Sequence, residues 1–145
     1  MFLGEYEHSL DVKGRLAIPA RFRALLGEGA IITRGFDECL VIYPAEVWRA
    51  FAERLDGLTA TQEAARMAKR FVFSGATECE FDRQGRVLVP TFLRSYAALT
   101  ETAVVVGQYS RIEVWDRGRW EEVSSRAEAE SGRIAEQLAS LGLDI

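Results

Sequence analysis

The sequence contains one motif twice, about half a chain apart. The stretch DVKGRLAIPARFR, residues 11–23, returns as DRQGRVLVPTFLR, residues 82–94. Over the longer segments 2–23 and 73–94, eight of 22 positions carry the same residue. Two copies form a pseudo-twofold pair, whereas a solenoid needs at least three. Because a half of roughly 70 residues is marginally stable alone, we expect the copies to share one core or to be stabilised by oligomerisation.

Both copies predict the same order of short elements, which makes the expected fold class α+β. In the first copy, β-rich or alternating stretches predict strands at residues 5–10, 15–18, 30–34 and 40–43. In the second copy, the corresponding strands are predicted at residues 77–81, 86–89, 102–106 and 112–115. Helices are predicted to begin at Pro19, Pro44, Pro90 and near residue 117. A linking helix precedes the second copy, with Thr59 or Thr61 as its N-cap.

The chain is divided into a first repeat with the linking helix (1–72), a second repeat (73–120) and a C-terminal amphipathic helix (121–145). The C-terminal segment repeats apolar residues at a spacing near 3.5, namely Val123, Ala127, Ile134, Leu138 and Leu141. This spacing predicts a helix with one apolar stripe. The stripe packs either on the core of its own chain or on a neighbouring subunit, and the sequence leaves both arrangements open.

The spacing D-x-x-G in both motifs predicts a hairpin turn. An aspartate at the first position of a turn can accept a hydrogen bond from the backbone two residues further on. A glycine three residues after it suits a left-handed backbone conformation that a side chain would strain. Four residues are therefore assigned a structural role in the hairpins: Asp11, Gly14, Asp82 and Gly85.

Turn formation does not explain the arginine that follows each glycine. A two-stranded ribbon fits the major groove of DNA, and arginine can bind guanine O6 and N7 together. The basic residues of the hairpins and of the first helix form a candidate DNA-binding set: Lys13, Arg15, Arg21, Arg23, Arg83 and Arg86. The alternative is that the arginines form ion pairs with Glu7, Glu78 or acids of a neighbouring subunit.

The net charge of −4 would argue against nucleic acid if it were spread evenly. Residues 121–145 carry six acids and two bases, so the 120 residues before them are neutral in total. Within that neutral part, residues 11–23 carry four bases and one acid. A local patch, rather than the charge of the whole chain, decides what one face attracts.

The paired D-x-x-G-R motifs, with the segments FLGEYEHSLDVKGR and FVFSGATECEFDRQGR, resemble the MraZ family of bacterial transcriptional regulators. The resemblance covers essentially the whole chain. It implies a duplicated swapped-hairpin β-barrel of the AbrB and SpoVT type, related to MazE antitoxins, with both half-units in one chain and flanking helices. It also implies a ring-shaped homo-oligomer, commonly an octamer. Such a ring binds repeated boxes in double-stranded promoter DNA and typically represses the division and cell-wall gene cluster, including its own gene.

Carried onto this sequence, the resemblance implicates both motifs but not equally. It points to Asp11, Lys13, Gly14 and Arg15 in the first copy, and to Asp82, Gly85 and Arg86 in the second. Gln84 stands in the second copy where Lys13 stands in the first. We therefore expect the first hairpin to contribute more to DNA binding than the second.

Two other classes of function are weighed against a DNA-binding regulator. One is an enzyme, but His8 is the only histidine and the sequence has neither a nucleophile–base constellation nor a phosphate-binding glycine loop. We expect no catalytic residues. The other class is a ring-forming protein-interaction or antitoxin-like module that does not itself read DNA.

No cofactor, metal or small-molecule ligand is expected. Cys39 and Cys79 have no Cys or His neighbour at metal-ligand spacing, so we expect free thiols. The sequence predicts neither a signal peptide nor a membrane span. The expected location is therefore the cytoplasm, in association with the nucleoid.

Overall fold

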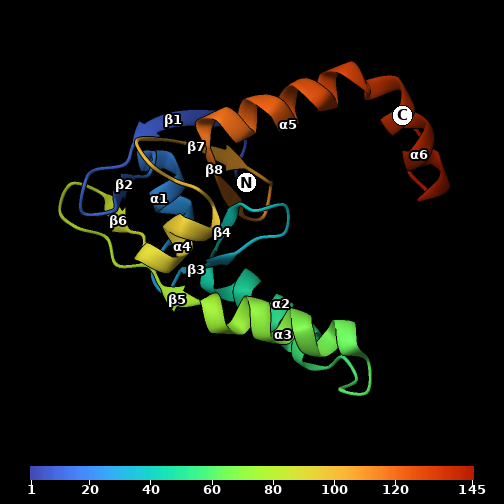
Figure 1. The fold of residues 1–145 in the computed structure, drawn as a ribbon, viewed down its shortest axis with the longest axis horizontal. Helices are drawn as coiled ribbons and strands as arrows, with labels where there is room; N and C mark the ends of the chain where they lie inside the picture. Colours follow the sequence, from blue (N-terminus) through green and yellow to red (C-terminus); the bar gives the residue numbers. More distant parts are fainter.

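A computed structural model describes all 145 residues as a β-rich body with two helical arms (Figure 1). The first repeat contains β1 (Glu5–Ser9), β2 (Arg15–Ala17), α1 (Ala20–Leu26), β3 (Ile31–Arg34), β4 (Leu40–Tyr43), α2 (Ala45–Asp56) and α3 (Glu63–Gly75). The second contains β5 (Thr77–Glu78), β6 (Arg86–Leu88), α4 (Thr91–Tyr96), β7 (Thr102–Gly107), β8 (Ile112–Asp116), α5 (Arg117–Ala129) and α6 (Ser131–Ser140). The same order of elements in both halves confirms the predicted duplication and the α+β class.

Both repeats contribute three strands to one antiparallel sheet, in the order β1-β7-β8-β4-β3-β5, and the outermost strand at each edge pairs with a strand of the other repeat. β1 of the first repeat pairs with β7 of the second, with Glu7 opposite Val104. In the same way, β5 of the second repeat pairs with β3 of the first, with Ile31 opposite Glu78. β4 and β8 meet at the centre of the sheet, where they pair across the pseudo-twofold axis. Each repeat therefore completes its sheet with a strand from the other, which is the predicted swapped arrangement.

β2 and β6 form a second, two-stranded sheet that again takes one strand from each repeat. Beyond the strands, the Ile18 amide donates a hydrogen bond to the Gly85 carbonyl at 3.3 Å. The equivalent bond runs from the Val89 amide to the Gly14 carbonyl at 2.8 Å. The two copies of the D-x-x-G-R motif are therefore paired directly with each other.

Arg23 on α1 and Arg94 on α4 stabilise this pairing. Each donates to a main-chain carbonyl of its own repeat, at 2.6 Å from Arg23 and 3.0 Å from Arg94. The guanidinium of Arg23 covers Gly85, and that of Arg94 covers Gly14, so each arginine lies on the glycine of the other repeat. A Cβ atom on Gly14 would lie 2.7 Å from Arg94 Nε. We call this arrangement of two arginines and two glycines the cross-repeat lock.

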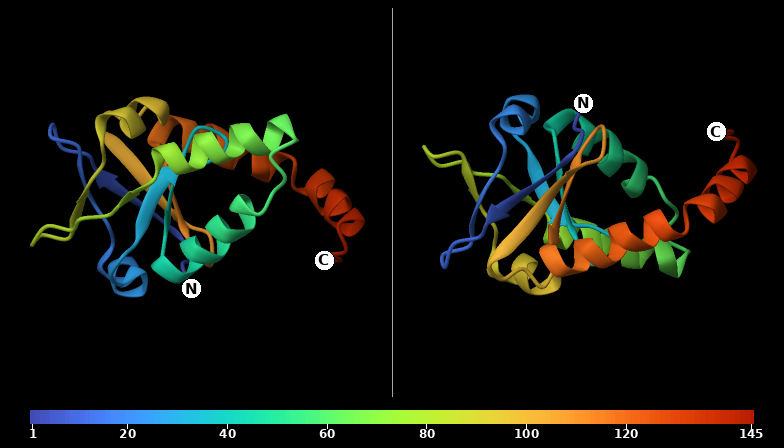
Figure 2. Two further views of the ribbon diagram at one scale, coloured as in Figure 1. Left: turned by 90° about the horizontal axis from the view of Figure 1, so that it is seen from below. Right: turned by 90° about the horizontal axis from the view of Figure 1, so that it is seen from above.

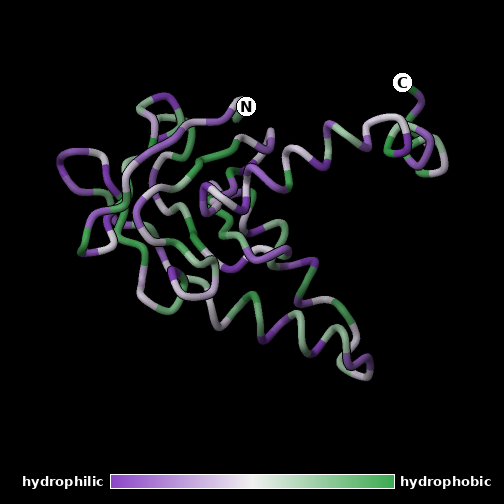
Figure 3. Tube along the Cα trace, turned by 45° about the horizontal axis from the view of Figure 1, so that its top comes forward, coloured by the Kyte–Doolittle hydropathy of each residue, from purple (hydrophilic) through white to green (hydrophobic).

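The main hydrophobic core is one cluster of 19 buried residues drawn from both repeats. Its largest fully buried side chains include Phe22 and Leu16 from the first repeat and Leu93 and Val87 from the second. Hydrophobic segments run through the body, whereas the helical arms alternate between hydrophobic and hydrophilic residues (Figure 3). The repeats share this core, as the length of each half predicted.

The two repeats differ in their helical arms. α3 folds back beside α2 and packs on β3, where the Thr33 hydroxyl donates to the Val72 carbonyl at 2.6 Å. α5 packs on β7 and β8, and α6 makes its one substantial contact with α5. α3 buries Ala65, Val72 and Gly75, but neither α5 nor α6 has a buried residue. In Figure 1, α6 lies far from the body at the end of its arm.

Two element predictions in and near the linking helix are wrong. α3 begins after Gln62 without a side-chain cap, and the hydroxyls of Thr59 and Thr61 lie 3.1 Å from each other instead. The strand predicted over residues 77–81 is reduced to the two residues of β5, and Phe81 forms only an isolated bridge. At the start of α3 a contact between two hydroxyl groups takes the place of the expected cap, and near Phe81 a single backbone bridge takes the place of the expected strand.

The C-terminal segment forms two helices rather than the single predicted helix. α5 ends at Ala129, and Glu130 after it has a ψ of 14°, which is not helical. Gly132 follows in the first turn of α6, and glycine disfavours a continuous helix at this point. No helix in the structure combines the length and the apolar character that a membrane crossing requires.

Replacing Gly85 with alanine should destabilise the chain by about 1–3 kcal/mol. The new side chain would have to adopt a left-handed conformation at φ +76° and would displace the Arg23 guanidinium. Gly132→Ala is the matched control, because a Cβ there meets nothing within 4 Å and alanine favours a helix. Urea unfolding measures both variants. A Gly85→Ala protein as stable as Gly132→Ala would contradict the cross-repeat lock.

Candidate nucleic-acid interface

The two hairpin loops protrude together from one end of the body. The first joins β1 to β2 through residues 10–14, and the second joins β5 to β6 through residues 79–85. Figure 2 shows both loops on the side opposite the helical arms. The pairing of β2 with β6 holds them there. Motifs that are far apart in the sequence therefore form one surface, which we call the hairpin end.

Asp11 shapes the first loop with both oxygens of its carboxylate. Oδ1 accepts hydrogen bonds from the backbone amides of Lys13 at 3.0 Å and Arg15 at 2.9 Å. Oδ2 accepts a hydrogen bond from Arg15 Nε at 2.7 Å. Gly14 lies between them at φ +84°, in the left-handed region. The predicted aspartate bond two residues on and the predicted left-handed glycine are both confirmed.

The second loop repeats this arrangement around Asp82. Its Oδ1 accepts from the amides of Gln84 at 2.9 Å and Arg86 at 3.0 Å. Its Oδ2 accepts from Arg86 Nε at 2.9 Å. Gly85 has a φ of +76°. The D-x-x-G-R spacing is therefore one folded unit, in which the aspartate holds both the turn and the arginine.

The arginine after each glycine is thus ion-paired within its own motif. The partners are Asp11 and Asp82, not Glu7 or Glu78, the alternative that the sequence left open. Because the bond uses Nε, the outer NH1 and NH2 edge of Arg15 stays available for another partner. The side chain of Arg15 is 36% exposed and that of Arg86 is 27% exposed.

Arg86 has two carboxylate partners, whereas Arg15 has one. Arg86 NH1 also lies 3.4 Å from Oδ2 of Asp11, so Arg86 bridges the carboxylates of both motifs. Arg15 contacts only the carboxylate of its own motif. The two guanidinium groups and two carboxylates form a small network across the pseudo-twofold axis.

The two aspartates keep their charge in the folded protein. The pKa of Asp11 is lowered below its usual 3.8, first by the hydrogen bond from the Arg15 amide. The pKa of Asp82 is lowered in the same way by the Arg86 amide. A carboxylate with a lowered folded pKa stabilises the fold above its unfolded pKa, and this contribution is lost as pH falls through the folded value. The loops are therefore in their ionised, bonded form at neutral pH.

Lys13 and Arg83 lie at the tips of the two loops. Both are exposed, and neither forms an ion pair. They occupy neighbouring rather than equivalent positions, since Val12 stands opposite Arg83 and Lys13 opposite Gln84 in the repeat. Each loop tip therefore carries one uncompensated cation.

The arginines of α1 lie behind the loops in two different settings. Arg21 is exposed, and its NH2 donates to the Tyr6 hydroxyl at 3.1 Å. Arg23 is half-buried in the cross-repeat lock, where its NH1 donates to the Ile18 carbonyl. Of the six candidate residues, the structure gathers Lys13, Arg15, Arg83 and Arg86 at the hairpin end, with Arg21 and Arg23 further back.

Two exposed apolar residues belong to the same surface and were not predicted as part of it. Val12 is 98% exposed at the first loop tip, and Leu88 is 52% exposed on β6. The exposure of Leu88 could have been predicted from the sequence, because strand residues alternate between faces. Its neighbours Val87 and Val89 are fully buried, which places Leu88 on the outer face.

The rest of the molecule has no arrangement typical of a metal or thiol centre. No group of three or more His, Cys, Asp or Glu side chains is placed to hold a metal ion. Cys39 and Cys79 are free thiols, and burial raises the pKa of both to about 12. Neither thiol is therefore ionised at neutral pH.

Comparison with known proteins agrees with this architecture. The chain matches the family described as "MraZ protein, putative antitoxin-like" twice, over residues 1–71 and 72–141. It is 51% identical over 143 residues to the transcriptional regulator MraZ of Desulfitobacterium hafniense strain Y51, covering 99% of this chain and 100% of the relative. It is 49% identical to the protein of that name from Herpetosiphon aurantiacus and 47% identical to that from Heliobacterium modesticaldum, with the same coverage.

The two family matches correspond to the two interlocked repeats, and the relatives match from end to end. These relatives are transcriptional regulators, which confirms the prediction that the chain is not an enzyme. The chain belongs to the MraZ family of transcriptional regulators.

Proposed function

We propose that this chain regulates transcription by binding double-stranded promoter DNA with its hairpin end. The observation that carries the proposal is the gathering of four cationic side chains from two distant motifs on one protruding surface, Lys13, Arg15, Arg83 and Arg86. A two-stranded ribbon fits the major groove, and arginine is the side chain best suited to guanine. The regulator name of the relatives supports the same function.

In each motif, some residues shape the loop and others contact DNA. The aspartates and glycines set the shape of the loops, so the arginines emerge in a fixed direction. The outer edge of Arg15 reads base edges, with a smaller contribution from Arg86, whose NH1 is shared with Asp11, while Lys13 and Arg83 contact phosphates. Arg21 adds a phosphate contact from α1. Arg23 is held within the cross-repeat lock, so its main role is to support the DNA-binding surface rather than to contact DNA.

The first hairpin contributes more than the second. Arg15 is more exposed than Arg86 and is held by one carboxylate, whereas Arg86 is shared between two. Arg21 beside the first hairpin has Phe92 as its counterpart in the second repeat. The first hairpin therefore presents more unsatisfied positive charge to a phosphate backbone.

Several chains act together in a ring-shaped homo-oligomer, an octamer in the form that the family resemblance favours. A row of hairpin ends then engages repeated promoter boxes, and linked sites can raise the affinity by about 10²–10⁴-fold over a single site. The regulated genes are those of the division and cell-wall cluster, including the chain's own gene, and the output is repression. The protein acts in the cytoplasm at the nucleoid.

A second candidate function follows from the antitoxin-like description of the family. In that case the chain is an interaction module that does not read DNA. An electrophoretic mobility shift with DNA from upstream of the chain's own gene separates the two functions. A shift that survives excess scrambled competitor DNA supports the regulator, and the absence of any shift supports the interaction module.

Lys13→Ala should weaken DNA binding and flatten its salt dependence. Each phosphate contact contributes a slope of about 0.9 in the logarithm of affinity against the logarithm of salt concentration. Arg49→Ala is the control, because Arg49 is an exposed and unpaired cation on α2, away from the hairpin end. Fluorescence anisotropy across a salt series measures both variants. Equal effects of the two substitutions would remove the hairpin end as the binding surface.

Arg15→Ala should cost about 1–3 kcal/mol of specific binding, as expected for a lost contact to a base. Arg86→Ala should cost less, because Arg86 is committed to two carboxylates in the free protein. Arg15→Lys keeps the charge but loses the fork geometry, and it distinguishes base reading from general attraction. Anisotropy with cognate and scrambled duplexes gives the ranking, and thermal unfolding shows that each variant is folded. Equal small losses for both alanine variants would refute the ranking.

A further inference from the structure

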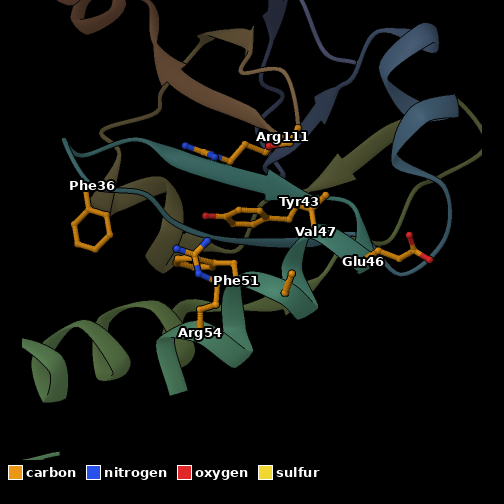
Figure 4. Close-up of a pocket in the computed structure, with 9 residues that line it drawn as sticks. Phe36, Tyr43, Glu46, Val47, Phe51, Arg54 and Arg111 are labelled. Carbon is orange, nitrogen blue, oxygen red and sulfur yellow. The ribbon is translucent and has the colours of Figure 1, made fainter. Parts of the chain in front are cut away.

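A cavity of about 530 Å³ lies against α2, away from the hairpin end (Figures 1 and 4). Its lining comes from α2, from the end of β4 and from the turns that join β3 to β4 and β7 to β8, so both repeats contribute to it. The volume falls within the range of about 300–1,000 Å³ that is typical of small-molecule sites. No single sequence motif marks this cavity, because its lining residues come from separate segments of the chain.

The hydroxyl of Tyr43 in this cavity has no hydrogen-bond partner. Tyr43 is only 8% exposed, and its ring stacks on Phe51 with the ring centroids 5.4 Å apart. The hydroxyls of Tyr6 and Tyr96, in contrast, are both hydrogen-bonded. Buried polar groups in proteins usually have a partner. Burial raises the pKa of Tyr43, and the charge of Arg111 opposes this rise only in part, so the hydroxyl keeps its proton at neutral pH and can donate it to an anion.

Two arginines lie at the same end of the cavity as this hydroxyl. Figure 4 shows the guanidinium groups of Arg54 and Arg111 at the end to which the Tyr43 hydroxyl points. Neither arginine forms an ion pair or a side-chain hydrogen bond. Glu46 is the only acid in the lining, and its carboxylate points to the opposite end. The end with the hydroxyl therefore carries uncompensated positive charge.

Two further acids lie nearby but do not neutralise this charge. Asp37 and Glu113 line a smaller, adjoining cavity of about 210 Å³, which shares Arg111 with the larger one. Neither acid lines the larger cavity or forms an ion pair with its arginines. The carboxylate of Glu113 instead accepts a hydrogen bond from Trp115 Nε1 at 3.0 Å.

The equivalent place in the second repeat has the opposite character. Trp115 stands there at the position of Tyr43, and its ring N–H is bonded to Glu113 rather than free. Arg126 stands at the position of Arg54. The cavity of about 630 Å³ beside them contains Arg126 as its one base and four acids, Asp37, Glu38, Glu113 and Glu130. The duplicated fold therefore provides two cavities, of which only the one against α2 suits an anion.

We propose that the cavity against α2 binds a nucleoside monophosphate, with its phosphate at Arg54, Arg111 and the Tyr43 hydroxyl. A phosphate monoester carries a charge of about −1.5 to −2 at neutral pH and three acceptor oxygens, which match two guanidinium groups and one O–H donor. Phe36 is 61% exposed at this end of the cavity, and a base can stack on its ring. The site is separate from the hairpin end, so the inference goes beyond the proposed function.

Isothermal titration calorimetry of the full-length chain with GMP and AMP tests this site. We expect one nucleotide to bind per chain, because only one of the two equivalent cavities is cationic. Guanosine lacks the phosphate and inorganic phosphate lacks the ring, so each should bind at least about tenfold more weakly than GMP. The proposal fails if neither nucleotide binds at millimolar concentration, or if guanosine or inorganic phosphate binds as tightly as GMP.

Tyr43→Phe removes the hydroxyl and keeps the ring on Phe51. It should weaken the binding of GMP about tenfold, as expected for the loss of one hydrogen bond to a charged group. Its thermal stability should not fall, because the hydroxyl has no partner to lose. Arg54→Ala should weaken binding by a similar factor, whereas Arg126→Ala, the matched control in the second repeat, should bind GMP as wild type does. Wild-type affinity for GMP in Tyr43→Phe or Arg54→Ala would overturn the proposal.

Lys13→Ala separates this site from the hairpin end, whose cations also attract phosphate. We expect Lys13→Ala to bind GMP as wild type does while it loses affinity for DNA, and Tyr43→Phe to show the reverse. A nucleotide that is lost from Lys13→Ala but retained by Tyr43→Phe would be bound at the loops, and the proposal would be overturned. A wild-type chain that binds GMP but no DNA would refute only the proposed function.

Discussion

The pairing of β2 with β6 is the interaction on which the rest of the structure depends. It joins the two motifs through backbone hydrogen bonds, and the cross-repeat lock covers each glycine with an arginine from the other repeat. The shared core forms beneath this contact, and the two loops protrude above it. One short ribbon therefore sets both the interlocked fold and the position of the cations at the hairpin end.

Much of this arrangement can be read from the sequence, because the repeat is explicit and turn chemistry is local. The motif spacing predicted the hairpins, and the prolines predicted the starts of α1, α2 and α4, which begin at the next residue. The position of Arg23 could not be predicted, because its contact with Gly85 depends on how the repeats cross in space. For the same reason the bridge from Arg86 to Asp11 has no signal in either motif alone.

The C-terminal segment shows where periodicity stops being informative. Its apolar spacing predicted a stripe, but the break at Glu130 turns one helix into two and leaves α6 outside the body. Periodicity reports that a face is apolar, not what covers it. In the first repeat α3 packs on both α2 and β3, whereas in the second repeat α6 makes its one substantial contact with α5. The difference between the repeats lies in these arms more than in the strands.

Placing both half-units in one chain has a consequence for how the body folds. When the strands of such a barrel come from separate chains, its stability depends on protein concentration, because folding and association are one equilibrium. Here β1 reaches β7, and β5 reaches β3, within a single polypeptide, so the body can form at any dilution. The covalent link also frees the two loops to diverge in sequence. The exchange of Lys13–Gly14 for Gln84–Gly85 is a change that a barrel of two identical chains could make only in both loops at once.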